Sequence, residues 1–225
     1  MSRPVLILCA HGTANPQGQQ VVSTLHVLVR DARPDLQVEL AYVDVQRPSV
    51  VDVVAEWAPV APEVVVVPVL LATGYHVQVD IADAVVPFEN ARSAAPLGPD
   101  PVLSEILAER IDAGGLKPDD AVVVAAAGSS RPDARYAPEQ AARELAERLG
   151  REVTVGFGAS ARPTVPEAVE AVRQGHPRVV IAAYLLAPGY FHDQLHQAGA
   201  DVVTAPLGAD PRLAELIVRR FEESR

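Results

Sequence analysis

The chain has a single cysteine and no apolar run long enough to cross a membrane. One cysteine, Cys9, excludes a disulfide framework and a thiolate cluster for zinc or iron–sulfur. The first apolar run, residues 5–10, is also too short for the hydrophobic region of a signal peptide. We therefore expect a cytoplasmic protein that is neither exported nor bound to a membrane.

Positive charge is also scarce. Lys and Arg total 19 against 29 Asp and Glu, which gives a formal net charge of -10. This balance argues against a general affinity for nucleic acid or anionic membranes, so an anionic ligand would need a local basic pocket. The chain lacks a Gly-x-x-x-x-Gly-Lys-Ser/Thr phosphate loop and a Gly-x-Ser-x-Gly nucleophile elbow. ATP-driven chemistry and a serine nucleophile at such an elbow are therefore not expected.

Apolar β-branched runs, in contrast, are abundant. Of the 225 residues 49% are hydrophobic, which is ample for a buried core. Runs of this kind are typical of strands buried on both faces of a parallel sheet. They lie at residues 5–9, 38–43, 64–71, 122–126, 153–157 and 179–185. Helical spacing of apolar residues separates them, so the sequence predicts an α/β fold.

The chain contains an internal duplication. The segment "APLGPDPVLSEILAERI" at residues 95–111 returns as "APLGADPRLAELIVRRF" at residues 205–221. Aligning these segments also aligns "LLATGYHVQVDI" from Leu70 with "LLAPGYFHDQLH" from Leu185. We predict two homologous halves, residues 1–115 and 116–225, each with a roughly four-stranded parallel sheet flanked by helices. The active site is expected in the cleft between the halves.

Three ionisable residues of the first half have inert counterparts in the second. The pairs are His11 and Ala127, Asp44 and Ala159, and His76 and Phe191. All three ionisable residues follow predicted strands, and parallel sheets bind ligands beyond the carboxyl ends of their strands. Two imidazoles and a carboxylate suit Fe2+, Co2+, Ni2+ or Zn2+ and leave coordination positions open. The alternative is that each histidine only hydrogen-bonds the nearby backbone.

These motifs resemble the sirohydrochlorin chelatase family in its two-half form. The resemblance rests on "LCAHGTANPQG" at residues 8–18, "AYVDVQRPSV" at 41–50 and "VVVVPVLLATGYHVQVDI" at 64–81. It implies ATP-independent insertion of a divalent metal into sirohydrochlorin: Fe2+ to give siroheme, or Co2+ for cobalamin precursors. It also carries the family's metal-site histidines onto His11 and His76. Asp44 stands where the family often has Glu. The chain ends at "FEESR". It lacks the histidine-rich tail of some cobalt-inserting relatives, and this favours iron.

Metal insertion exchanges two pyrrole protons for one dication, so the site needs a weakly held metal beside a proton acceptor. Imidazole serves both purposes near neutral pH. We therefore expect His11 and His76 to be catalytic, and Asp44 to offset the charge of the ion or orient an imidazole. The family's substrate is an anionic tetrapyrrole.

The second half's counterpart of the His11 turn is "GSSR", at the predicted start of a helix. It makes Ser129, Ser130 and Arg131 candidate substrate contacts. The alternative there is plain helix capping by Ser130.

One further pair and two rival functions stay open. His192 and His196 lie four residues apart and form either an auxiliary metal site or an exposed polar helix face. The rivals are a non-catalytic carrier of metal or tetrapyrrole and a purely structural double domain. We expect no obligatory cofactor besides the substrate metal, Fe2+ or Co2+. The expected partners are sirohydrochlorin and the metal, with no nucleic acid or membrane, and the chain is expected to be a monomer or homodimer.

Overall fold

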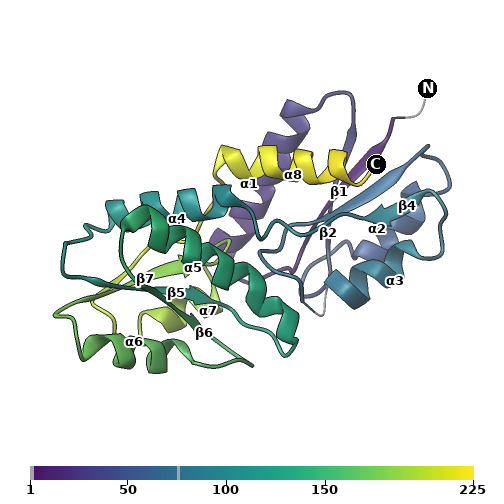
Figure 1. Ribbon diagram of the computed structural model, residues 1–225. Helices are drawn as coiled ribbons and strands as arrows, with labels where there is room; N and C mark the ends of the chain where they lie inside the picture. The colour runs from purple at the N-terminus through teal and green to yellow at the C-terminus, as the bar shows by residue number, and fades with distance from the viewer. Residues whose placement is uncertain (1–2, 75–76) are drawn as a thin grey trace. The chain divides into compact units, whose positions relative to one another are not determined.

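The computed structural model describes residues 3–74 and 77–225 (Figure 1). The chain forms two compact units. The first comprises Met1–Leu97 and Ala209–Arg225, and the second comprises Gly98–Gly208. Among the described residues, none of the helices has the length and apolar character that crossing a membrane requires.

The first unit is built on a four-stranded parallel sheet in the order β2-β1-β3-β4. Its strands are β1 (Val5–Ala10), β2 (Gln37–Tyr42), β3 (Val64–Pro68) and β4 (Ala91–Ser93). The helical segments are α1 (Pro16–Ala32), α2 (Val50–Trp57), the π-helix η1 (Val77–Ile81), α3 (Ala82–Val85) and α8 (Pro211–Glu223). Every residue of β1 and β3 is buried, as expected for central strands covered on both faces.

The second unit repeats this plan in the order β6-β5-β7-β8, with all neighbours parallel. Its strands are β5 (Ala121–Ala126), β6 (Val153–Phe157), β7 (Val179–Tyr184) and β8 (Val202–Val203). Its helical segments are α4 (Pro101–Ala113), the 3₁₀ segment η2 (Pro132–Arg135), α5 (Tyr136–Leu149), α6 (Val165–Arg173) and α7 (Tyr190–Leu195). The predicted α/β fold of two homologous four-stranded sheets is confirmed. The short edge strands β4 and β8 carry too few residues to stand out in the sequence.

Equivalent helices of the two repeats start in the same way. Ser49 caps α2 and Thr164 caps α6, each accepting a hydrogen bond from the amide three residues later. Asp100 and Asp210 cap α4 and α8, and each precedes a proline at the first helical position. A short side chain that accepts a hydrogen bond, followed by a proline that has no amide hydrogen to satisfy, is a strong helix start. The prolines at these positions therefore begin helices and do not interrupt them.

The compact units divide the chain differently from the predicted boundary between residues 115 and 116. The last helix of the first repeat, α4, packs on α5 and β7 in the second unit. The last helix of the second repeat, α8, packs on α1 and β3 in the first unit, where it lies beside α1 in Figure 1. The boundary at 115 therefore marks the sequence repeat and not the compact units, because the two repeats exchange their final helices.

Candidate active site

The first candidate residue, His11, follows directly after β1 and is exposed. Its Nδ1 lies 3.2 Å from the carbonyl oxygen of Gly12. Its own carbonyl accepts a 3.0 Å hydrogen bond from the amide of Asp44, and Ala10 accepts one of 3.1 Å from Val43. These bonds continue the pairing of β1 with β2 beyond both strands. They bring His11 and the exposed Asp44 to adjoining strand ends, as the sequence predicts.

Gly12 explains how the two loops come so close. Its φ is +95°, and a Cβ at this position would lie 2.1 Å from the carbonyl oxygen of Asp44. No side chain fits that space or favours that backbone conformation. The second repeat has the same turn, because Gly128 has φ +88° and its Cβ would lie 2.0 Å from the oxygen of Ala159. The scaffold is thus shared by both repeats, whereas the imidazole and the carboxylate belong to the first alone.

Polar contacts hold the Asp44 loop in place. Asp44 Oδ1 accepts a 2.7 Å hydrogen bond from the amide of Val45, a non-glycine residue with a φ of 59°. The side-chain oxygen of Gln46 accepts a 2.9 Å bond from the amide of Thr13, which ties this loop to the His11 turn. The carboxylate is therefore oriented by its own loop, and the loop by the neighbouring one.

The third predicted ligand, His76, lies outside the described residues. Within 3–74 and 77–225 no three His, Cys, Asp or Glu side chains gather closely enough to hold a metal ion. The set of His11, Asp44 and His76 therefore remains a prediction from the sequence.

Asp80, on the π-helix η1, is a further acidic residue that no sequence motif singles out. Burial raises the pKa of the Cys9 thiol to about 12, and the negative charge of Asp80 adds to this rise. The Asp80 carboxylate therefore lies near Cys9, which stands two residues before His11 in the sequence. Short π-helices occur frequently at functional sites. The duplication does contain a signal for it, because Asp80 is an ionisable residue of the first repeat that aligns with the apolar Leu195 of the second.

The "GSSR" loop differs from the expected helix start. The structure places a four-residue 3₁₀ segment, η2, after this loop, and the capping position is Arg131 without a side-chain cap. Ser129, and not Ser130, supplies the local acceptor, because its Oγ receives a 3.2 Å bond from the amide of Arg131. The expectation of Ser130 as a helix cap is wrong, since α5 begins only at Tyr136. A single 3₁₀ turn also presents little of the helix dipole invoked for anion binding.

The two histidines at α7, one on the helix and one at its C-cap, lie close together. The ring centroids of His192 and His196 are 5.2 Å apart, and His192 Nε2 lies 3.0 Å from the carbonyl oxygen of Thr204. His192 is partly buried and His196 is exposed.

The second unit exposes aromatic rings, which sequence analysis also missed. Tyr136 is 59% exposed, Tyr190 72% and Phe191 37%. All three follow the carboxyl ends of central strands, Tyr136 after β5 and the other two after β7. The Phe191 ring packs on Gly158, where a Cβ would lie 3.0 Å from the ring. Exposed aromatic surface at a ligand-binding edge is suited to a flat apolar ring system.

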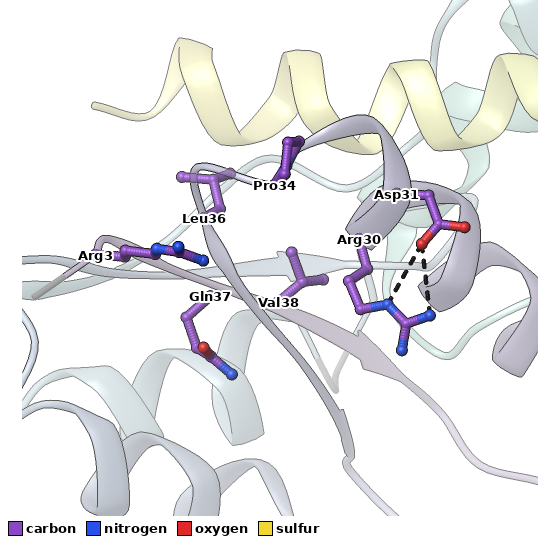
Figure 2. A pocket seen from close by; sticks show the side chains of 7 residues that line it. All are labelled: Arg3, Arg30, Asp31, Pro34, Leu36, Gln37 and Val38. Atoms are coloured by element: carbon purple, nitrogen blue, oxygen red, sulfur yellow. Dashed lines mark hydrogen bonds and ion pairs between the residues drawn. The ribbon is translucent and has the colours of Figure 1, made fainter.

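A hollow of about 510 Å³ lies at the other end of the first sheet. Figure 2 shows its lining around the starts of β1 and β2, with Arg30 turned to its neighbour Asp31. That ion pair spans 3.4 Å between exposed side chains. Since ligands of parallel sheets bind at the carboxyl ends, this hollow is not where the chemistry is expected.

Comparison with solved structures identifies the fold. SirB from Bacillus subtilis with Fe3+ matches 99% of this chain and 95% of its own, with a TM-score of 0.83 and 20% identity. CbiX, described as the terminal enzyme for biosynthesis of siroheme in denitrifying bacteria, matches 99% of this chain and 100% of its own, with a TM-score of 0.71 and 22% identity. The fold is that of the chelatases.

The family follows from the sequence itself. The CbiX family model matches residues 5–113 and 121–224, so the chain belongs to the CbiX family. The sirohydrochlorin cobaltochelatase of Methanothermobacter thermautotrophicus is 29% identical in an alignment of 135 residues that covers 48% of this chain and 94% of that relative. The resemblance to sirohydrochlorin chelatases seen in the sequence is confirmed. The relative matches about half of this chain, in keeping with the duplication.

Proposed function

We propose that this protein inserts Fe2+ into sirohydrochlorin without ATP, giving siroheme. The observation that carries the proposal is the His11–Asp44 loop pair. An exposed imidazole and an exposed carboxylate follow adjacent strands whose loops join through a 3.0 Å backbone hydrogen bond. The same turn in the second repeat holds Ala127 and Ala159. Membership of the CbiX family and the likeness to the Methanothermobacter sirohydrochlorin cobaltochelatase support the substrate.

The reaction sets the roles of these residues. The macrocycle loses two pyrrole protons as it takes up one dication, so the protein must hold the ion weakly and accept protons. His11 is exposed at the end of β1 and serves as an inner ligand of the incoming ion. His76 serves as the second ligand or as the proton acceptor. Asp44, oriented through its Oδ1 by the amide of Val45, offsets the positive charge of the ion.

Substrate recognition is assigned to the second unit. Ser129, Ser130 and Arg131 are the proposed contacts of the substrate carboxylates, and Arg131 lies 3.4 Å from Asp133 in the described structure. A substrate carboxylate competes with Asp133 for this guanidinium, which lets the arginine exchange one anionic partner for another. The exposed rings of Tyr190 and Phe191 offer apolar surface to the macrocycle.

The second candidate function is insertion of Co2+ in place of Fe2+. Insertion of Co2+ is favoured by the likeness to the Methanothermobacter sirohydrochlorin cobaltochelatase, and solved SirB structures contain either Fe3+ or cobalt. Imidazole and carboxylate ligands accept both ions, so a direct rate comparison is required.

The test is anaerobic absorbance of sirohydrochlorin with purified protein and either Fe2+ or Co2+. We expect insertion above the spontaneous rate, faster with Fe2+, and a fall of about 100-fold or more in His11→Ala and His76→Ala. The matched control is Ser129→Ala, which alters the equivalent turn of the second repeat and is expected to change substrate affinity more than turnover. A wild-type rate equal to the spontaneous rate would refute catalysis and favour a carrier of metal or tetrapyrrole.

A further inference from the structure

His192, on helix α7, and His196, the residue that follows this helix at its C-cap, form a pair of histidines outside the proposed insertion site. His192 and His196 are one helical turn apart, with ring centroids separated by 5.2 Å and ring planes at 82°. The pair belongs to the second unit, and the first repeat has Val77 and Ile81 at the aligned positions. The duplicated scaffold therefore does not require either imidazole.

The hydrogen bond of His192 determines which of its nitrogens is available. Nε2 lies 3.0 Å from the carbonyl oxygen of Thr204. A carbonyl oxygen only accepts hydrogen bonds, so Nε2 carries the hydrogen and Nδ1 of the neutral ring keeps its lone pair. Metal-binding histidines almost always use their second ring nitrogen in this way, since the bond fixes the tautomer and orients the ring.

The spacing of the rings fits a shared ion. Metal–imidazole bonds are about 2.0–2.1 Å long, and a ring nitrogen stands roughly 1 Å outside the ring centre. An ion bound to both rings would therefore lie about 3 Å from each centroid, which is compatible with centroids 5.2 Å apart. His196 at the C-cap keeps helical backbone angles, so its spacing of four residues from His192 presents such a pair without any change in the backbone.

We propose that His192 and His196 form an auxiliary site for a divalent first-row metal ion. In the described part of the chain no third His, Cys, Asp or Glu completes a cluster around them, so water fills the remaining positions. Such a site binds weakly and exchanges its ion readily, and imidazole ligands suit Ni2+, Zn2+ and Fe2+. The site does not depend on the proposed insertion activity, because it needs no tetrapyrrole.

The experiment uses Ni2+ as the probe in titration calorimetry of the full chain without tetrapyrrole. It starts from His11→Ala protein, so that the proposed insertion site does not contribute. We expect one bound equivalent in this background, and binding at least about tenfold weaker when His192→Ala or His196→Ala is added, because one of two ligands is lost. The matched control adds His176→Ala, which removes an exposed imidazole whose Nδ1 lies 3.1 Å from the carbonyl oxygen of Asp119.

A second readout locates the ion. Paramagnetic Ni2+ should broaden the imidazole NMR resonances of His192 and His196 before those of His176. The proposal would be overturned if adding His196→Ala to the His11→Ala protein left the Ni2+ affinity unchanged. Equal broadening of the His192, His196 and His176 rings would overturn it as well. His196 is exposed, so its replacement is not expected to disturb folding. Failure of insertion by the wild-type protein would leave this result unaffected, because the metal is titrated directly.

Discussion

The paired glycine turns allow the scaffold to be tested separately from the chemistry. Gly12→Ala and Gly128→Ala each introduce a Cβ at a φ near +90°, 2.1 and 2.0 Å from a carbonyl oxygen. The left-handed backbone costs a residue with a Cβ about 1–2 kcal/mol, and shifting the opposing loop costs about 1–3 kcal/mol more. We therefore expect each variant to lose about 2–5 kcal/mol of stability. A protein near the middle of the ordinary range of about 5–15 kcal/mol stays largely folded after such a loss.

The two variants should differ in activity. The loop that Gly12→Ala displaces carries Asp44, whose amide bonds to His11, whereas the loop that Gly128→Ala displaces carries Ala159. Insertion per folded molecule should fall at least about tenfold in Gly12→Ala, because a shift of about 1 Å in a catalytic group costs up to about 100-fold. Gly128→Ala should retain most of its turnover.

Stability is measured by urea unfolding, and activity by anaerobic absorbance well below the unfolding midpoint. Fluorescence of Trp57, the single tryptophan, follows the first unit, and far-UV circular dichroism follows both units. The slope grows with chain length, and at about 2–3 kcal/mol per molar urea the midpoint should fall by about 0.7–2.5 M. Wild-type stability in Gly12→Ala would refute the packing argument. Equal loss of turnover in both variants would refute the assignment of chemistry to the first repeat alone.

Three further predictions concern packing, substrate binding and pH. Phe221→Ala should cost about 3–5 kcal/mol and lower the unfolding midpoint reported by Trp57, since Phe221 is fully buried in the first unit; an unchanged midpoint would contradict the exchange of final helices. Arg131→Ala should raise KM for sirohydrochlorin with little change in kcat, in steady-state insertion assays; an unchanged KM would exclude this contact. A side-chain hydrogen bond from Arg33 lowers the pKa of Asp35 to about 2. The pair therefore stabilises the fold at pH values above the unfolded pKa of about 3.9, and this effect is lost as the pH falls toward 2. Asp35→Asn should therefore lower stability by less than about 1 kcal/mol at pH 7, because the carboxylate is exposed, and leave it unchanged below pH 2, by thermal unfolding at both pH values.

The sequence alone predicts much of this protein, because its decisive signals are local or repeated. Apolar β-branched runs place six of the eight strands found in the described part of the chain, since a strand buried on both faces needs a side chain of that kind at nearly every position. The duplication separates residues that the scaffold shares, such as Gly12 and Gly128, from His11 and Asp44, which have no ionisable counterpart. That comparison needs no coordinates.

Tertiary structure decided what depends on contacts between distant residues. Neither repeat indicates that its final helix packs on the sheet and helices of the other repeat, because the apolar face of α8 has the same pattern whichever partner covers it. The reason for Gly12 appears only once Asp44, 32 positions away in the sequence, is seen against it. Asp80 likewise lies near Cys9, and His192 Nε2 is bonded to the carbonyl oxygen of Thr204. Both contacts join segments that no local pattern connects. Local patterns determine elements, whereas the positions of polar groups around a site follow from how those elements pack.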